Sequence, residues 1–341
     1  MKKYHAYGIG AALVDTEIEV ADEELAAFGI EKGLMTLVDE ARQQTLVGHL
    51  QDHLTVARLA SGGSAANSII ALSYFGGRAY YSCKVANDEN GLFYLNDLAA
   101  AGVDHDGHDG LPDGTTGKCL VLITPDAERT MNTFLGISET LGSENLNLGA
   151  IEDSQYLYVE GYLVTSADSL DAAKTAARHA ERHGTRTALS LSDPGIVAHF
   201  RKELADIAGD GVDLLFCNRQ EAMSWTGENT MDAVIEAMKT TAKCFAITLG
   251  AEGALVYDGN TVHTIAPTRV TAVDTNGAGD MFAGAFLYGI TNGMSHADAG
   301  RLAGMAAAAV VAQFGPRLHA NQHKGILETV SAGSSIAGRN S

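Results

Sequence analysis

The alternation of apolar and polar positions is most regular in the second half of the chain. From about residue 156, short apolar runs alternate with segments whose apolar residues recur at helical spacing. Strands that alternate with helices of this length predict a mostly parallel sheet with helices on both faces. The strands expected there are 156–159, 187–191, 214–217, 244–248, 254–257 and 262–265, and the helices are 169–182, 196–208, 221–226, 231–240, 278–290 and 297–312.

The first half of the chain has a less regular pattern. Apolar runs predict strands at 4–10, 15–20, 35–38 and 79–85, and helical spacing predicts helices at 22–28 and 91–101. Residues 61–73 open with Ser-Gly-Gly-Ser and continue with small and apolar residues, which is typical of a loop that leads into a helix. Two apolar runs, 119–124 and 129–134, flank the turn sequence Pro125-Asp126 and therefore predict a β-hairpin.

Composition narrows the class of protein. The chain has 341 residues, of which 46% are hydrophobic and 19% are charged, so one large α/β domain with a substantial core is expected. A net charge of −19 argues against nucleic acid or an anionic membrane as the partner, since both attract a surplus of Lys and Arg. The four cysteines are scattered, which is typical of reduced thiols in a cytoplasmic protein. The longest apolar stretch, 305–312, is far shorter than the roughly 20 residues that span a bilayer.

The most specific local pattern is Asp274-Thr275-Asn276-Gly277-Ala278-Gly279-Asp280, which stands directly before a long apolar helix. Small residues at this point let backbone N–H groups converge at the helix N-terminus, an arrangement that binds phosphate and stabilises its developing charge. A carboxylate in the first helical turn, here Asp280, can accept a proton from an attacking hydroxyl. The alternative is a glycine-rich loop that only joins a strand to a helix, with Asp280 complementing the helix dipole.

This heptad, continued by Met281-Phe282-Ala283-Gly284-Ala285-Phe286, resembles the C-terminal signature of the ribokinase-like (PfkB) carbohydrate and nucleoside kinases. Further segments resemble family motifs in the same order along the chain, and the resemblance covers roughly residues 4–320. They are Gly62-Gly63-Ser64-Ala65-Ala66-Asn67, the stretch from Gly76-Gly77 through Asp88 and Gly91 to Gly102-Val103, Asn218-Arg219-Gln220-Glu221, and Thr248-Leu249-Gly250-Ala251-Glu252-Gly253.

The resemblance implies a role for each matching residue. Asp280 would be the general base, and the N–H groups of Gly277, Ala278 and Gly279 would form an anion hole. ATP would be bound by Asn218, Thr248, Gly250, Gly253, Gly277 and Gly279. Glu221 would hold Mg²⁺ through water, and Asp274 is a candidate ligand for a monovalent cation such as K⁺. Asp15, Gly63 and Asn67 would hold the hydroxyl groups of the acceptor, with Gly62 and Gly63 allowing a ring to approach the backbone.

Other motifs carry less weight. Gly8-Ile9-Gly10-Ala11-Ala12-Leu13 departs from a dinucleotide fingerprint at its sixth position, and the chain has no G-x-x-x-x-G-K-[ST] loop. The sequence offers no zinc pattern in which a glutamate base accompanies a histidine pair, and most of the twelve histidines are expected at the surface. Asn67 can also be interpreted as a helix cap, and Glu221 as a solvated helix residue.

Within the family, the N-terminal half is most similar to adenosine kinases, from the spacing of residues 8–35 and from 116–119 with 126–133. Apolar or small residues that face the acceptor would then cover a purine: Leu13, Cys119, Met131 and Phe134. Ala11 departs from this subfamily, in which an Asn is expected. A sugar such as ribose, fructose or a sugar acid is therefore the alternative acceptor, and Arg129 would meet either an acidic sugar or the phosphates of ATP.

The expected architecture is a three-layer α/β/α sandwich over residues 1–330, with a small β lid from about 14–59 and 115–134 and a flexible tail at 331–341. We expect a monomer or homodimer that binds a small nucleoside or sugar. A non-catalytic binding protein on the same fold would be expected to lose Asp280 or the glycines before it, and this chain keeps them.

Overall fold

The computed structural model describes residues 2–50, 58–107 and 110–337, and its centre is a nine-stranded sheet. The strand order is β14-β13-β12-β11-β10-β9-β1-β5-β6. Seven neighbouring strands are parallel: β1 (Tyr4–Ile9), β5 (Ala79–Ser82), β6 (Val103–His105), β9 (Ser154–Glu160), β10 (Arg186–Ser190), β11 (Val212–Asn218) and β12 (Ala242–Thr248). The edge strands β13 (Ala254–Tyr257) and β14 (Val262–Ile265) are antiparallel.

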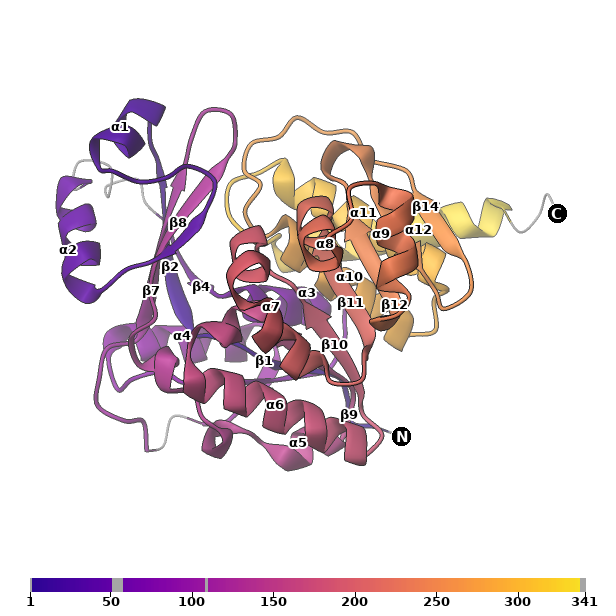
Figure 1. The fold of residues 1–341 in the computed structure, drawn as a ribbon, viewed down its shortest axis with the longest axis horizontal. Helices are drawn as coiled ribbons and strands as arrows, with labels where there is room; N and C mark the ends of the chain where they lie inside the picture. Colours follow the sequence, from indigo (N-terminus) through magenta and orange to yellow (C-terminus); the bar gives the residue numbers. More distant parts are fainter. Residues whose placement is uncertain (1, 51–57, 108–109, 338–341) are drawn as a thin grey trace.

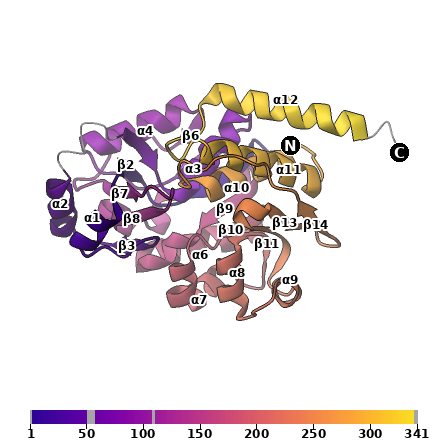
Figure 2. The same ribbon diagram turned by 90° about the horizontal axis from the view of Figure 1, so that it is seen from above.

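Helices cover both faces of this sheet (Figures 1 and 2). One face carries α3 (Ser64–Tyr74), α4 (Glu89–Ala100), α10 (Ala278–Thr291), α11 (His296–Val311) and α12 (Ala320–Ala337). The other carries α5 (Leu148–Glu152), α6 (Ala167–Arg182), α7 (Pro194–Ala208), α8 (Arg219–Thr226) and α9 (Met231–Met238). Successive strand residues enter opposite cores, as Leu214 and Leu215 do on β11, because side chains alternate along a strand. The predicted three-layer α/β/α class is confirmed.

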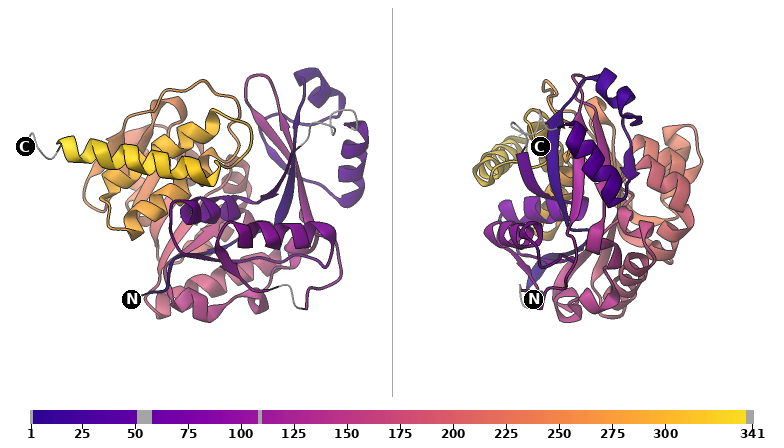
Figure 3. Two further views of the ribbon diagram at one scale, coloured as in Figure 1. Left: turned by 180° about the vertical axis from the view of Figure 1, so that it is seen from behind. Right: turned by 90° about the vertical axis from the view of Figure 1, so that its left-hand side faces the viewer.

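A second, five-stranded sheet stands beside the first (Figure 3), with the order β3-β8-β7-β2-β4. Its strands are β2 (Leu13–Glu19), β3 (Met35–Leu37), β4 (Arg58–Gly62), β7 (Gly117–Ile123) and β8 (Arg129–Phe134). Two helices, α1 (Asp22–Ala27) and α2 (Glu40–His49), pack on its outer face against Ile18, Leu120 and Leu122. We call this sheet with α1 and α2 the small sheet. Residues 51–57 of the expected lid lie outside the described residues.

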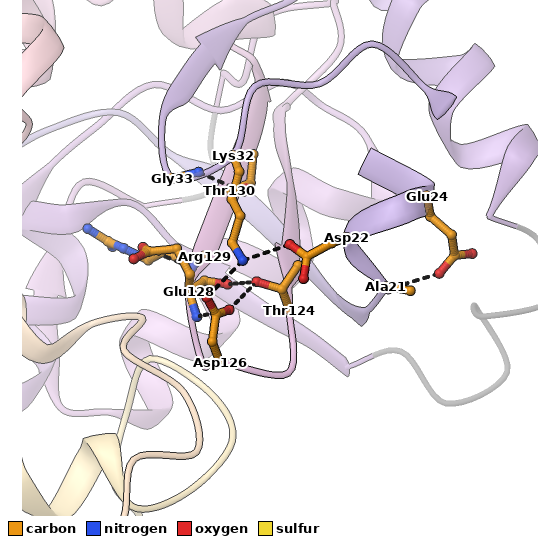
Figure 4. Close-up of polar contacts among 10 residues, drawn as sticks. All are labelled: Ala21, Asp22, Glu24, Lys32, Gly33, Thr124, Asp126, Glu128, Arg129 and Thr130. Atoms are coloured by element: carbon orange, nitrogen blue, oxygen red, sulfur yellow. Dashed lines mark hydrogen bonds and ion pairs between the residues drawn. The ribbon is translucent and has the colours of Figure 1, made fainter. Parts of the chain in front are cut away.

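The turn of the β7–β8 hairpin is tied to the segment after α1 (Figure 4). Lys32 Nζ lies 2.7 Å from Asp22 Oδ1 and 2.8 Å from Asp126 Oδ2, and Thr124 Oγ1 donates to Asp126 Oδ1 at 2.7 Å. The Gly33 N–H donates to Thr130 Oγ1 at 3.0 Å. Exposed ion pairs contribute little stability, so these contacts mainly fix the direction of the hairpin.

Several elements were not predicted from the sequence: α2, β4, β6, α5 and α12, with the short 3₁₀ turns η2 (Gly136–Thr140), η3 (Ser143–Asn145), η4 (Gly161–Thr165) and η5 (Gly250–Glu252). Helix α12 continues to Ala337, well past the boundary at residue 331 where a flexible tail was expected, and 338–341 lie outside the described residues. Within the described part of the chain, no helix is both long enough and apolar enough to cross a membrane.

Candidate active site

The N-terminus of α10 has the backbone that the heptad implied. Gly277, the residue before the helix, has φ +73°, and a Cβ there would lie 2.2 Å from the carbonyl oxygen of Pro316. A side chain at Gly277 is therefore excluded by conformation and by space. Gly279 differs, because a Cβ there would meet nothing within 4 Å. Packing therefore does not require a glycine at position 279. The absence of a side chain there leaves the backbone accessible to a ligand.

Asp280, in the first turn of α10, faces the first turn of α3. Its Oδ1 accepts a hydrogen bond from Ser64 Oγ at 2.6 Å, and its Oδ2 accepts one from Asn67 Nδ2 at 3.1 Å. Burial raises the pKa of Asp280 above its usual range, while these two bonds and the nearby Arg129 charge oppose the rise. Asn67 is buried within α3, and the N-terminal residue that precedes α3 is Gly63, so Asn67 is not a helix cap.

A cavity lies between this helix junction and the small sheet. Most of the predicted acceptor residues line it, together with Asp280: Leu13, Asp15, Gly63, Asn67, Cys119, Arg129 and Met131. The main-sheet side contributes mostly polar groups. The inner face of the small sheet contributes most of the apolar side chains, including Met35 and Leu37 on β3, and also the polar Asp15, Arg129 and Thr133. The small sheet thus supplies most of the apolar lining, while polar groups line both sides of the cavity.

The expectation that Phe134 covers the acceptor is wrong. Met131 and Thr133 line the cavity, and Phe134 is absent from its described lining. Side chains alternate along β8, so Phe134 has the same parity as Thr130 and Asn132 and is directed away from the cavity. Apolar cover at the far end of β8 comes instead from Leu135.

The two glycines before α3 are required because neighbouring atoms leave no room for a side chain at either position. A Cβ at Gly62 would lie 2.0 Å from Asp15 Cγ, so this glycine makes room for the Asp15 carboxyl. Gly63 has φ +92°, and a Cβ there would lie 2.4 Å from the carbonyl oxygen of Ala11.

The environment of Asp15 disfavours its ionised form. Burial, and then the neighbouring Glu17, raises the pKa of Asp15 well above its usual range, and the positive charge of Arg317 opposes this rise.

The small sheet contacts the loop before α10 directly. Arg129 Nη1 donates to Asn276 Oδ1 at 3.3 Å, Asn276 Nδ2 donates to Glu17 Oε1 at 3.1 Å, and Thr275 Oγ1 donates to the carbonyl oxygen of Ala127 at 3.0 Å. A shift of the hairpin would therefore be transmitted to the loop that carries Gly277.

Arg129 lines the cavity, where acidic groups lie near its charge. Burial opposes its charge, but Tyr162 and the carboxylates of Asp280, Asp193 and Glu221 raise the pKa of the guanidinium. Arg129 is the sole cationic side chain among the described residues that line the cavity.

Glu160, at the end of β9, was missed by the sequence analysis. It is 1% exposed, and its two carboxylate oxygens accept hydrogen bonds of 2.7 Å from the N–H groups of Ala11 and Ala65. Burial raises its pKa to about 7, although these two bonds favour the ionised form. Glu160 joins the turn before β2 to the first turn of α3. A carboxylate at the end of the apolar run 156–159 was the signal that could have identified it.

Four of the residues expected at the nucleotide, Asn218, Thr248, Gly250 and Gly253, lie at or just after the carboxyl ends of β11 and β12, and none of the four is in the described lining of the cavity. Asn218 and Thr248 are paired in register across these strands. Gly250 and Gly253 follow in the loop after β12, with φ of +59° and +96°. The carboxyl edge of a parallel sheet is where open α/β folds bind ligands.

Asn218 and Glu221 form a capping box. Glu221 Oε2 accepts from the Asn218 N–H at 2.9 Å, Glu221 Oε1 accepts from Asn218 Nδ2 at 2.6 Å, and Asn218 Oδ1 accepts from the Glu221 N–H at 2.8 Å. Glu221 is 5% exposed, so it is not a solvated helix residue, and burial raises its pKa to about 7. A carboxylate oxygen has more than one lone pair, so the box can still accept water that surrounds a metal ion.

Asp274 is fully buried and holds the loop together. Its Oδ1 accepts from the Asn276 N–H at 2.8 Å, and its Oδ2 accepts from the Gly315 N–H at 2.9 Å. Both oxygens therefore have structural partners, and a cation would have to share them.

A buried carboxylate and small residues at a helix N-terminus, beside the carboxyl edge of a covered parallel sheet, define a small-molecule kinase of the ribokinase-like class. The chain belongs to the pfkB carbohydrate kinase family, whose model matches residues 36–323. It is an ATP-dependent kinase and is similar to adenosine kinases, as the sequence analysis predicted.

Three comparisons illustrate the relationship. The crystal structure of adenosine kinase from Sinorhizobium meliloti has 36% identity and a TM-score of 0.88, over 93% of this chain and 96% of that one. A probable sugar kinase protein from Rhizobium etli has 33% identity and a TM-score of 0.89, over 99% of both chains. Adenosine kinase of Saccharomyces cerevisiae is 27% identical over 304 residues, which is 84% of this chain and 88% of that protein.

We predict that Glu160→Gln flattens the pH dependence of stability. The folded-state pKa of Glu160 is raised from its usual 4.5 to about 7. Between these values the folded chain holds a proton that the unfolded chain has released, so this group makes stability fall as pH rises, by up to about 3 kcal/mol. The free energy of unfolding, measured with urea at several pH values in this range, should change less steeply with pH for Glu160→Gln than for the wild type. The exposed Glu236→Gln is the control, and equal slopes for wild type and Glu160→Gln would contradict the prediction.

Proposed function

We propose that the protein phosphorylates the hydroxymethyl group of a nucleoside similar to adenosine. The observation that carries this proposal is the group of apolar side chains that the small sheet contributes to a cavity with many polar groups, since a nucleoside has a polar ribose and a flatter, more apolar base. Leu13, Cys119 and Met131 would cover the base, while Asp15, Gly63 and Asn67 would hold the ribose. Asn67 Oδ1 supports this orientation, because it is buried without a hydrogen-bond partner among the described residues and can accept a bond from a ribose hydroxyl.

In the proposed reaction, Asp280 accepts the proton of the acceptor hydroxyl. The hydroxyl oxygen forms a bond to the γ-phosphorus of ATP, the bond from that phosphorus to the β–γ bridging oxygen breaks, and ADP leaves. Ser64 and Asn67 orient the carboxylate through the bonds described above. The raised pKa of Asp280 brings its proton affinity nearer to the working pH, which favours general-base catalysis.

The proposed roles at the nucleotide follow from position and charge. The backbone of Gly277, Ala278 and Gly279 would stabilise the transferred phosphoryl group, and Arg129 would neutralise phosphate charge from the hairpin side. Asn218, Thr248, Gly250 and Gly253 would line the path of ATP along the sheet edge. Mg²⁺, when bound, neutralises phosphate charge, and Glu221 would hold it through water. A K⁺ ion near Asp274 would stabilise the loop before α10.

A sugar kinase is the second candidate. The similarity to the probable sugar kinase protein of Rhizobium etli favours it, as does a 28% identity over 244 residues to a probable fructokinase of Arabidopsis thaliana. The same catalytic residues would serve either acceptor, so only the apolar residues in the cavity lining distinguish the two acceptors.

Replacement of Asp280 tests the base. Asp280→Asn keeps the shape of the side chain and removes the proton acceptor, so kcat should fall by about 10²–10⁴-fold while the binding of ATP and acceptor stays nearly constant. Asp232→Asn, at an exposed first-turn position of α9, is the matched control. A kcat close to that of the wild type would remove Asp280 from the mechanism.

The open position at Gly279 gives a test of the anion hole. Gly279→Ala meets no neighbouring atom within 4 Å, so the unfolding midpoint should not fall. The methyl group should block the transferred phosphoryl group and lower kcat by about 10²–10³-fold, as the loss of one oxyanion donor does. A raised KM for ATP with an unchanged kcat would assign this loop to nucleotide binding alone.

The choice of acceptor can be tested on β8. Met131→Ala should lower kcat/KM for adenosine roughly 5–30-fold, because it removes apolar cover from the base. This corresponds to a loss of about 1–2 kcal/mol of transition-state stabilisation. It should leave ribose and fructose nearly unaffected. Phe134→Leu, three residues along the same strand and directed away from the cavity, is the control. A wild-type preference for a free sugar over adenosine would overturn the nucleoside acceptor and leave the kinase chemistry intact.

A further inference from the structure

A group of metal-ligating side chains lies outside the kinase site, where α5 meets the C-terminal end of α6. Its members are Glu152, His179 and His183, and one ligand atom from each lies within 4.8 Å of the others. His179 Nε2 is 3.0 Å from Glu152 Oε1, and His183 Nε2 is 3.6 Å from the same oxygen. The two imidazole rings are adjacent, with centroids 4.2 Å apart.

The hydrogen bonds around His183 fix which nitrogen is available. His183 Nδ1 lies 2.9 Å from the carbonyl oxygen of His179, and a carbonyl can only accept, so Nδ1 carries the proton. In the neutral ring, Nε2 then carries a lone pair and lies 3.6 Å from Glu152 Oε1. A lone pair and a carboxylate this close favour a positive charge between them, either a proton or a metal ion. A histidine whose other nitrogen donates to a backbone carbonyl is the usual form of a metal ligand.

The spacing also fits a metal ion. Zn–N and Zn–O bonds of about 2.0–2.1 Å in a tetrahedral site place ligand atoms about 3.3 Å apart, and the two measured separations lie on either side of this value. We propose that Glu152, His179 and His183 bind a divalent transition-metal ion, with Zn²⁺ as the ion that two imidazoles and one carboxylate suit best. Lys2 does not occupy the site, because its Nζ donates to the Glu152 carbonyl oxygen and to Thr185 Oγ1.

Two of the three proposed ligands form a pattern that is visible in the sequence. His179-Ala180-Glu181-Arg182-His183 has the i, i+4 spacing that places two histidines on one face of a helix. This segment does not match hydrolytic zinc motifs, because its glutamate, Glu181, lies at a different position between the two histidines. The third ligand comes from another helix, 27 residues before His179.

The site is separate from the kinase pocket. Ser169, near the start of α6, lines the pocket, and His179 lies ten residues further along, about 15 Å of helix rise away. A bound ion would join the last residue of α5 to the end of α6, which lie side by side at one face of the main sheet (Figure 1). We therefore expect the ion to stabilise this helix pair without contributing to phosphoryl transfer.

The test is calorimetric titration of the metal-free chain, without a histidine tag or nucleotide, with Zn²⁺ and separately with Mg²⁺. The wild type should bind one Zn²⁺ at this site, and Mg²⁺, which prefers oxygen ligands, should not compete. His183→Gln and Glu152→Gln should each weaken Zn²⁺ binding by more than about 100-fold, beyond the effect of losing an outer-shell partner. Both side chains are substantially exposed, so both variants should fold.

His199→Gln is the matched control, because exposed His199 also donates Nδ1 to the carbonyl oxygen four residues before it, at 2.8 Å. Zn²⁺ should raise the Tm of the wild type and His199→Gln, and should not raise the Tm of Glu152→Gln. Kinase activity should be the same in all four proteins. The proposal would be overturned if the wild type did not bind Zn²⁺, or if His183→Gln and Glu152→Gln bound Zn²⁺ as tightly as the wild type. The cluster would then be a proton-bridged group.

Discussion

The contact between the first turns of α3 and α10 is the constraint on which the site depends. Two hydrogen bonds join Asp280 to Ser64 and Asn67, although these residues lie more than 200 positions apart. The helices can approach this closely because Gly284, one turn further along α10, leaves no room for a side chain: a Cβ there would lie 2.2 Å from the carbonyl oxygen of Ser68. A small residue in the core of the two helices therefore sets the position of a carboxylate at the surface of the cavity.

Burial of Asp280 at this junction has an electrostatic consequence. A carboxylate moved out of water has a raised pKa, and the hydrogen bonds and Arg129 recover only part of the lost solvation. The packing of α3 against α10, which is among the most extensive between the described helices, offsets the free-energy cost of this lost solvation. An arrangement of this kind fits a proton acceptor better than a capping group, since a cap would gain more from staying solvated.

The sequence was most informative where local pattern and tertiary role coincide. The parallel strands and covering helices after residue 156 follow from periodicity, and the heptad located the start of α10 at Ala278. Helix α2 was missed because its sequence, Glu-Ala-Arg-Gln-Gln-Thr-Leu-Val-Gly-His, has few apolar residues, and only Asp39, whose side chain accepts from the Arg42 N–H, marks its beginning. The error at Phe134 has a different origin, because the face of a strand depends on parity and the apolar character of a residue does not reveal it.

Glu160 and the Glu152–His179–His183 group could be identified only in part from a single sequence, for a shared reason. Each gains its meaning from partners that lie far away along the chain, the N–H groups of Ala11 and Ala65 in one case and a neighbouring helix in the other. Only the topology, which places β1 beside β9 and α5 beside α6, brings these groups together.

The charge of the molecule poses the remaining question of how an acidic protein binds ATP. Asp15, Glu160 and Asp280 line the cavity, and Arg129 alone among its described lining residues carries a positive charge. Under the proposed function, the attraction for ATP would be local, supplied by the N-terminus of α10, by a metal ion and by Arg129, because the net charge of −19 repels an anion at long range. Since Arg129 is held by Asn276, which precedes the helix, the guanidinium and the N–H groups of this loop occupy fixed relative positions. In the proposed reaction, both groups would act on the same phosphate only while the hairpin stays against the loop, so the position of the small sheet would be a condition for catalysis.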